Sequence, residues 1–207
     1  MSLFITFEGG EGSGKSSALR LIDERLRKEG YETVLTREPG GTPIAEAIRN
    51  VILDKANVAM DSRTEALLYA ASRRQHLVEK VWPALKAGKL VLCDRYLDSS
   101  LAYQGGARGL GIDNVLNVNS FATEGTFPDL TLLFDIEPEL GLARIAANSS
   151  REVNRLDLEK MDFHRGVRAT FHEIAARYPE RFVIIDASQP LEKVVDDAYK
   201  AIKERMK

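Results

Sequence analysis

The chain has 207 residues, of which 44% are hydrophobic and 29% charged, with a formal net charge of −2, values ordinary for one soluble globular domain. This balance excludes the broad basic surface of a nucleic-acid-binding protein, and the single cysteine, Cys93, excludes an intramolecular disulfide and indicates a reducing compartment. Because no apolar run reaches transmembrane length and no cationic segment precedes the first predicted strand, we expect a cytoplasmic protein without a signal peptide or a membrane partner.

The first predicted elements are a strand over residues 3–7 and a helix over residues 17–29, with a glycine-rich segment between them. Gly9, Gly14, Lys15 and Ser16 fill the G-x-x-x-x-G-K-[ST] pattern of a phosphate-binding loop. Glycines let successive N–H groups turn toward phosphate oxygens, and the helix N-terminus adds partial positive charge. We therefore expect a nucleoside triphosphate to bind here, with Lys15 on its phosphates and Ser16 at a Mg²⁺ position. A glycine-rich turn that only opens a helix is the alternative, and the strand-loop-helix setting makes it the weaker one.

Strand and helix patterns alternate along the rest of the chain. Strands are expected over residues 31–36, 90–94, 130–135 and 182–186. Helices are expected over residues 43–53, 63–81, 97–103, 114–123, 138–148, 158–178 and 190–206. Thr42 is the expected cap of the second helix, Asp61 or Ser62 caps the third, and Pro83 should kink or restart the chain after it. Glycines at 105, 106, 109 and 111 predict a loop, and the polar segment 148–154 predicts a mobile one.

Five buried strands joined by helices predict a three-layer α/β/α fold with a parallel sheet, in one domain over residues 1–207. Ligands of such sheets bind outside the carboxyl ends of the strands. Besides the phosphate loop, the segments that follow predicted strands are Arg37-Glu38 and Asp94-Arg95-Tyr96. Asp94 is placed as a second, acidic anchor for Mg²⁺ would be.

Arginines gather around this predicted site. They are Arg37, Arg49, Arg73, Arg95, Arg151 and Arg155. A kinase with a phosphorylated acceptor must hold two anionic groups close together, which is costly without cations between them. The arginines therefore favour a nucleotide acceptor, although for any one of them alone a solvated surface charge is the commoner case.

Residues for recognising a base are less distinct in the sequence. Tyr69 and Arg73 are four apart on one predicted helix, so they share a face and can stack on a base and bond its edge. Tyr69 fits a core position equally well, and Gln104 fits either a base contact or a loop. The three histidines, His76, His164 and His172, fit surface or core positions better than metal ligation.

Four collinear motifs make the chain resemble the thymidylate kinase family, in its bacterial form. They are FEGGEGSGKS at 7–16, REPGGT at 37–42, DRY at 94–96 and AYQG at 102–105. The resemblance implies transfer of the γ-phosphoryl group of ATP, with Mg²⁺, to dTMP to give dTDP. It also implies the nucleoside monophosphate kinase version of the P-loop NTPase fold, and a homodimer.

The resemblance also assigns roles to single residues. Glu11 matches a residue that faces the dTMP sugar, Tyr103 one that crowds its 2′ position, and Tyr69 one that stacks on thymine. The acceptor phosphate is expected on Arg37, Arg49 and Arg95, and the thymine edge on Arg73 and Gln104. The whole dTMP set is Glu11, Arg37, Glu38, Arg49, Tyr69, Arg73, Arg95, Ser100, Tyr103 and Gln104. The ATP set is Gly9, Gly10, Glu11, Gly12, Ser13, Gly14, Lys15, Ser16, Ser17 and Arg144, with Ser16 and Asp94 at the metal.

One departure concerns the arginine that some members carry directly after the acidic loop residue, because this chain has Gly12 there. Members of this kind place the cation in a mobile lid, here at about residues 148–156. The resemblance thus adds Arg151 and Arg155 to Lys15 and Arg95 as catalytic residues and leaves open which of the two acts. Arg144 is expected to pack on adenine, near residues 187–189.

Two alternatives remain beside a dTMP kinase. One is a kinase for another deoxynucleotide or nucleoside. The other is a regulatory switch that binds GTP, although the chain lacks the Asn/Thr-Lys-x-Asp motif that reads guanine in such switches.

Overall fold

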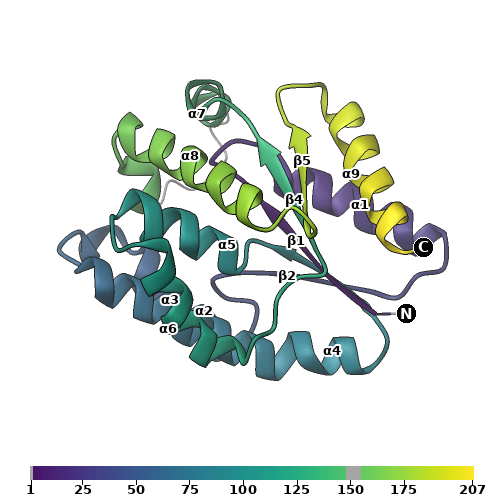
Figure 1. Cartoon of the computed structure of the whole chain (residues 1–207), viewed down its shortest axis with the longest axis horizontal. Helices are drawn as coiled ribbons and strands as arrows, with labels where there is room; N and C mark the ends of the chain where they lie inside the picture. Colours follow the sequence, from purple (N-terminus) through teal and green to yellow (C-terminus); the bar gives the residue numbers. More distant parts are fainter. Residues whose placement is uncertain (1, 148–154) are drawn as a thin grey trace.

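Residues 2–147 and 155–207 are described by the structure, a computed structural model, and they form the predicted five-stranded parallel sheet with helices on both faces (Figure 1). The strands are β1 Leu3–Glu8, β2 Thr33–Arg37, β3 Leu90–Asp94, β4 Leu130–Asp135 and β5 Phe182–Asp186. In the order β2-β3-β1-β4-β5, the central β1 pairs with β3 on one side and β4 on the other. The chain builds one half of the sheet before it crosses to the other. Such a change of direction opens a crevice at the carboxyl ends of the central strands.

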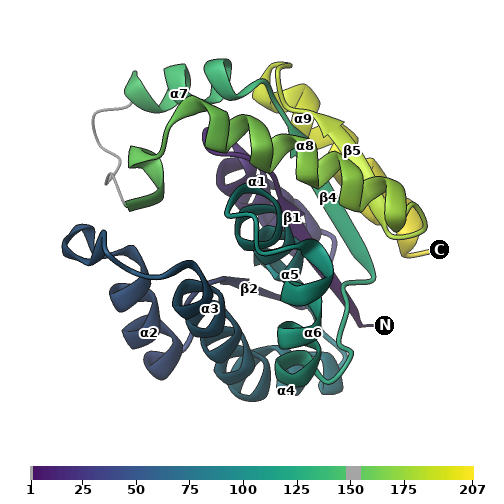
Figure 2. The same ribbon diagram turned by 60° about the vertical axis from the view of Figure 1, so that its left-hand side comes forward.

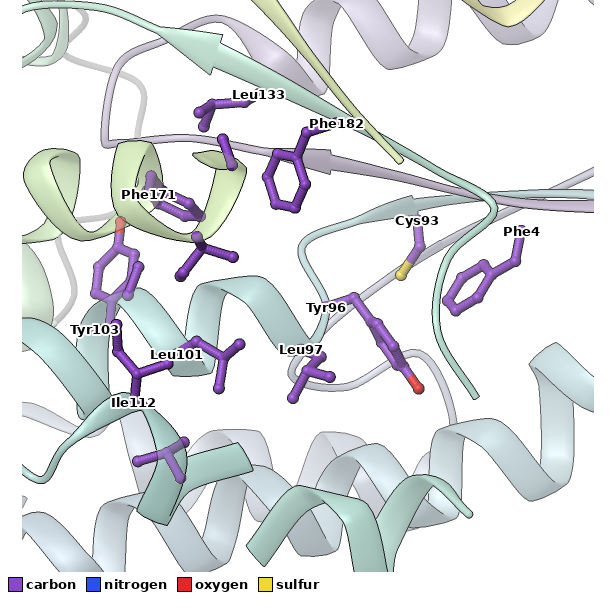
Figure 3. Packing of buried hydrophobic residues seen from close by; sticks show 14 of the residues in the cluster. Phe4, Cys93, Tyr96, Leu97, Leu101, Tyr103, Ile112, Leu133, Phe171 and Phe182 are labelled. Atoms are coloured by element: carbon purple, nitrogen blue, oxygen red, sulfur yellow. The ribbon is translucent and has the colours of Figure 1, made fainter. Parts of the chain in front are cut away.

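Side chains of the central strands alternate between two hydrophobic cores. In β1, Phe4 packs into one core, whereas Ile5 and Phe7 pack into the other. Successive side chains of a strand point to opposite faces, so a strand covered on both faces must be apolar nearly throughout. In the first core, the rings of Phe4 and Tyr96 pack edge to face, with their centroids 4.8 Å apart (Figure 3).

The helices are divided unequally between the two faces (Figure 1). α1 (Lys15–Lys28) and α9 (Leu191–Arg205) cover one face and complete the second core. The remaining helices are α2 Pro43–Leu53, α3 Ser62–His76, α4 Trp82–Lys86, α5 Leu97–Ser100, α6 Ile112–Thr123, α7 Pro138–Ala146 and α8 Met161–Arg177. Short helical segments are η1 Lys55–Asn57, η2 Leu77–Val81, η3 Leu101–Ala107 and η4 Arg155–Leu158. Figure 2 shows α7 and α8 on one side of the β1–α1 junction and α2 and α3 on the other. Within the described part of the chain, no helix has the length and apolar character needed to cross a membrane.

The single helix predicted over residues 63–81 is interrupted. α3 ends at His76, and the chain continues through the π-helical segment η2 before α4 begins at Trp82. Pro83 lacks an N–H group and its ring crowds the preceding turn, so the backbone widens there and Trp82 N–H donates to the Leu77 carbonyl. The chain thus stays helical past Pro83, and the kink or restart predicted there takes the form of this wider turn before α4.

The loop predicted at Gly105 and Gly106 is wrong, because both residues belong to η3. A Cβ at Gly106 would lie 1.9 Å from Thr170 Oγ1 on α8, and one at Gly105 would lie 3.0 Å from Ile112 Cα. These glycines therefore permit close packing rather than a turn.

Helix caps follow the sequence only in part. Asp61 caps α3, since its carboxylate accepts the N–H groups of Arg63 and Thr64 at 2.9 and 3.1 Å. Thr42 stands at the N-cap of α2, but its side chain makes no capping hydrogen bond. Glu46 instead accepts the Gly41 N–H at 2.7 Å. The lid predicted at about 148–156 lies outside the described residues except for its last two.

Candidate active site

The phosphate loop joins β1 directly to α1, as its mechanism requires. Gly14 adopts a left-handed conformation (φ 80°) immediately before the helix begins. Lys15 is buried, and its Nζ donates to the Gly10 carbonyl at 3.2 Å. Burial and the nearby charge of Arg95 lower the pKa of Lys15 below its ordinary value, against the opposing effect of Glu11. Ser13 Oγ is buried without a hydrogen-bond partner among the described residues, which suits a loop that receives phosphate oxygens.

Gly12 is required by contact as well as by conformation. Its φ is +70°, and a Cβ there would lie 2.0 Å from the Gly141 carbonyl oxygen of α7. The same contact constrains Gly141, whose Cβ would lie 2.2 Å from the Glu11 carbonyl oxygen. No side chain fits at position 12 in this arrangement, so the arginine that the resemblance places there in some members would collide with α7 here.

A pair of oxygen ligands stands beside the loop. Ser16 Oγ donates to the carboxylate of Asp94, and Asp94 ends β3 directly opposite Phe7 of β1. The described residues contain no cluster of three or more His, Cys, Asp or Glu side chains that would hold a metal unaided. Mg²⁺ commonly takes one or two protein oxygens and completes its shell with water and phosphate. The residues present therefore fit Mg²⁺ bound together with a nucleotide.

A cavity beside the loop collects all ten residues predicted to contact dTMP. We call it the acceptor cavity. It is lined by Glu11, Lys15, Ser16, Arg37, Glu38, Pro39, Arg49, Leu53, Tyr69, Arg73, Asp94, Arg95, Tyr96, Ser99, Ser100, Tyr103, Gln104 and Leu156. The sequence thus predicts correctly which side chains meet, while their contacts with dTMP stay a prediction.

Arg95 lines the acceptor cavity and is held tightly there. Its guanidinium donates to the Gly9 carbonyl at 3.0 Å, to Ser99 Oγ at 3.1 Å and to Glu11 at 2.6 Å, and it lies 5.0 Å from the centre of the Tyr103 ring. Burial opposes its charge, but Tyr103, Glu11 and other neighbouring acids raise its pKa above the ordinary value. Arg95 is therefore a fixed, permanent cation.

Two more arginines line the same cavity. Arg49 donates to the Pro39 carbonyl at 2.9 Å, and the exposed Arg37 pairs with Glu46 at 3.0 Å. Burial and the neighbouring charge of Arg37 lower the pKa of Arg49. The two positive charges repel each other, so binding an anion between them would relieve this repulsion.

α3 contributes Tyr69 and Arg73 to the lining of the acceptor cavity. Arg73 is almost completely buried, and it donates to Glu38 at 2.8 Å, to the Tyr96 carbonyl at 3.0 Å and to Ser100 Oγ at 3.1 Å. Tyr69 lies one turn earlier and lines the cavity, so the shared face predicted for the two residues is confirmed. Glu38 also accepts from His76 at 2.9 Å, so His76 is a hydrogen-bonded core residue, one of the two placements predicted for it.

A second cavity lies on the other side of the phosphate loop, and we call it the donor cavity. It is lined by Glu11, Gly12, Ser13, Gly14, Lys15, Ser16, Ser17, Arg144, Ile145, Ala187, Ser188, Gln189, Pro190, Leu191 and Val194. Arg144 donates to the carbonyls of Ala187 and Ser188 at 2.8 and 3.2 Å. The predicted meeting of Arg144 with residues 187–189 is confirmed, while contact with adenine stays a prediction.

The two lid arginines differ in what is described of them. Arg151 lies outside the described residues. Arg155 is buried, donates to the Ile52 carbonyl at 3.0 Å and pairs with Glu65 of α3. In this structure Arg155 therefore contacts the α3 side of the acceptor cavity.

Three buried polar residues have no role predicted from the sequence, although the first of them, Glu8, lies inside the motif at 7–16. Glu8 is fully buried and accepts the Tyr96 N–H at 2.7 Å and the Ser99 hydroxyl at 2.5 Å, so it holds the loop that carries Arg95. Asn119 accepts a hydrogen bond from Arg73, and Glu65 one from Gln104. Glu8 could have been found as an acidic residue at the end of an apolar strand. Glu65 could have been found by its spacing of four residues from Tyr69, which places both on one helix face.

Comparison with known proteins gives one consistent result. The family model described as Thymidylate kinase matches residues 7–198. Thymidylate kinase of Halalkalibacterium halodurans is 60% identical over 203 residues, which are 98% of this chain and 97% of that protein. Thymidylate kinase of Bacillus velezensis is also 60% identical, over 99% of this chain and 97% of that protein. The crystal structure of thymidylate kinase from Ehrlichia chaffeensis matches with a TM-score of 0.79 at 32% identity and covers 98% of both chains.

Proposed function

The chain belongs to the thymidylate kinase family, and we propose on this premise how its residues divide the reaction between the two cavities. It is a phosphotransferase that phosphorylates dTMP, and ATP is the phosphoryl donor in this family. In our proposal ATP occupies the donor cavity and dTMP the acceptor cavity.

The observation that carries this proposal is that the two cavities share Glu11, Lys15 and Ser16. Nucleotides placed in them would meet phosphate to phosphate at these residues. Two unit charges 4 Å apart at an effective dielectric constant of 20 repel by about 4 kcal/mol. Lys15 lines both cavities, and Arg49 and Arg95 line the acceptor cavity, so these cations would offset the repulsion.

We propose that Ser16 and Asp94 hold Mg²⁺ together with the ATP phosphates. When bound, the ion would neutralise charge on the phosphate oxygens. The Ser16 hydroxyl and the Asp94 carboxylate already lie side by side, so neither needs to be recruited from elsewhere in the fold.

The transfer we propose is direct, without a covalent enzyme intermediate. A phosphate oxygen of dTMP attacks the γ-phosphorus of ATP, and the bond from that phosphorus to the ADP oxygen breaks. Lys15 and Arg95 stabilise the charge that is spread over the transferred group, and an arginine of the segment 148–156 adds to it. The buried walls of the acceptor cavity exclude water and so disfavour hydrolysis.

The test compares acceptors side by side: dTMP, dUMP and thymidine with ATP, and dTMP with ATP or GTP. We expect ATP with dTMP to be the fastest pair, and thymidine to be inert because it offers no phosphate to Arg37, Arg49 and Arg95. Faster turnover of thymidine would indicate a nucleoside kinase, and tight GTP binding without transfer would indicate a regulatory switch.

We further propose a homodimer formed by α2, α3 and α6. These three helices expose large apolar side chains, namely Ile44, Val51, Leu67, Val118 and Phe121. Phe121 is 92% exposed, and apolar clusters of this kind mark interaction surfaces. Sedimentation should give a dimer that Phe121→Asp weakens; a monomeric wild-type protein would refute this.

A cytoplasmic location is proposed as expected for an enzyme that consumes ATP and dTMP.

A further inference from the structure

Glu65 is a buried carboxylate bonded to Gln104, which lines the acceptor cavity, and none of the sequence motifs includes it. It lies one turn before Tyr69 on α3 and is only 1% exposed. Its oxygens accept from Gln104 Nε2 at 2.9 Å and from Arg108 at 3.4 Å, and they pair with Arg155. Three elements, α3, η3 and η4, therefore meet on one carboxylate.

The charge of Glu65 is secure. Burial alone would raise its pKa, but the hydrogen bonds from Arg155 and Gln104 and the charge of Arg108 hold it below the ordinary value. An ionised carboxylate has no proton to donate, so every group that faces it must be a donor.

This requirement decides the orientation of the Gln104 amide. An amide has an NH₂ pole that donates and an oxygen pole that accepts, and the two can be exchanged by a half-turn of the side chain. Because Glu65 only accepts, the NH₂ pole must face it, and the half-turned amide would set oxygen against oxygen. Gln104 lines the acceptor cavity, so the pole it offers to a ligand there is the oxygen.

The neighbouring edge of the cavity has the opposite character. Arg73 has five N–H groups and no acceptor. Four of them donate to Glu38, Asn119, the Tyr96 carbonyl and Ser100, which fixes the guanidinium plane. The lining of the acceptor cavity thus includes a donor, Arg73, and an acceptor, the Gln104 oxygen.

We propose that Glu65 is a positioning residue that locks Gln104 with its oxygen toward the base and thereby selects pyrimidines with an oxygen at position 4 and N–H at position 3. This rests on the proposed function, with dTMP in the acceptor cavity. Thymine and uracil have this edge. Cytosine has an amino group at position 4 and a bare nitrogen at position 3, so it would meet donor with donor and acceptor with acceptor. Sites built to bond a polar substrate edge reject the mismatched analogue strongly.

The decisive experiment measures kcat/KM for dTMP and for dCMP in the wild type and in Glu65→Gln. The amide introduced by this substitution can donate as well as accept, so it no longer dictates the orientation of Gln104. We expect the dTMP:dCMP ratio to fall about 10- to 100-fold, mainly through KM for dTMP, as for loss of a charge-assisted hydrogen bond. A ratio within about twofold of the wild type, less than about 0.5 kcal/mol, would overturn the proposal.

Glu159→Gln is the matched control. Glu159 is the second carboxylate that pairs with Arg108 among the described residues, at 2.6 Å, so this variant also removes one charge from the cluster without touching Gln104. Its ratio should stay at the wild-type value; an equal fall would assign the effect to Arg108 and refute the role of Glu65.

Gln104→Met keeps the proposal testable even if Glu65→Gln does not fold. Met is similar in length and lacks both poles, so the dTMP:dCMP ratio should fall as in Glu65→Gln, and an unchanged ratio would refute the proposal. Failure of the proposed function is distinct from all of these results, because wild-type protein would then not phosphorylate dTMP at all.

Discussion

Arg95 has a left-handed backbone conformation, with φ at 68°, which side-chain-bearing residues rarely adopt. Such a conformation costs on the order of 1–3 kcal/mol and persists where surrounding contacts determine it. Glu8 supplies those contacts from two directions. It accepts the Tyr96 N–H next to Arg95 in the chain, and it accepts from Ser99, whose hydroxyl receives the Arg95 guanidinium. One buried carboxylate therefore holds both the backbone and the side chain of this arginine.

Glu8 should make stability depend on pH. Burial and the charge of Asp98 raise its pKa from 4.5 to about 8. The folded state holds this proton more tightly than the unfolded chain does. Protonated Glu8 therefore stabilises the fold fully below about pH 4.5, and this stabilisation is lost as the pH rises through 8. Urea titrations from pH 5 to 8 give the free energy of unfolding of the wild type and of Glu8→Gln. The wild-type value minus the variant value should fall by up to about 1.4 kcal/mol per pH unit. A constant difference across this range would contradict it.

The two candidate lid arginines should separate in kinetics. Arg155 already pairs with Glu65 and bonds the Ile52 carbonyl, so Arg155→Ala should mainly raise KM for dTMP. Arg151→Ala should mainly lower kcat, by about 10³- to 10⁵-fold if that side chain reaches the transferred phosphoryl group. Steady-state kinetics with saturating ATP measures both parameters. The reverse assignment, with kcat lost in Arg155→Ala alone, would show that Arg155 leaves Glu65 during the reaction.

At the scale of elements, the phosphate loop and α7 are fitted to each other by two glycines. Gly12 and Gly141 each meet a backbone carbonyl of the other segment, so the two backbones touch directly. α7 also carries Arg144, which lines the donor cavity. The position of α7 therefore determines how the loop and Arg144 face a bound nucleotide.

Gly141→Ala should reduce activity although alanine favours helices. Its Cβ would lie 2.2 Å from the Glu11 carbonyl oxygen, so α7 or the loop must move. A displacement of about 1 Å can cost up to a hundredfold, and we expect kcat/KM for ATP to fall by about 10- to 100-fold.

The control for this substitution is Gly166→Ala on α8. There the nearest atoms are those of Ala107 at 3.7 Å, an ordinary contact. This variant should keep full activity. Its free energy of unfolding, measured by thermal denaturation, should rise by up to about 1 kcal/mol. Equal activity of the two variants would contradict the role assigned to the glycine contact.

Elements were predictable where local pattern and packing agree. β3, β4 and β5 have the predicted bounds. β3 and β4 are apolar runs buried on both faces, which leaves little choice of conformation, and the edge strand β5 keeps its predicted bounds although Ile184 is exposed. The π-helical segments were not predictable, since η3 depends on how closely α8 approaches Gly106. This wide turn carries Tyr103 and Gln104, which both line the acceptor cavity.

For the whole molecule, strand order converts four separate motifs into one site. β1 and β3 pair in parallel, so the phosphate loop and Asp94 emerge side by side, and the ten expected dTMP residues line one cavity. The motifs themselves could be identified from sequence because each has its own spacing. The partners of those residues could not, since Glu8, Glu65 and Asn119 act through contacts between elements distant in the chain.

Following the γ-phosphoryl group tests the central claim, direct transfer between two cavities that share Lys15, most closely. The protein is mixed with Mg²⁺, dTMP and ATP labelled in its γ-phosphoryl group, and the products are separated at early times. We predict that label appears in dTDP in amounts equal to the ADP formed, and that Lys15→Ala abolishes both products. Label found in inorganic phosphate or on the protein, with dTMP left unreacted, would contradict the account.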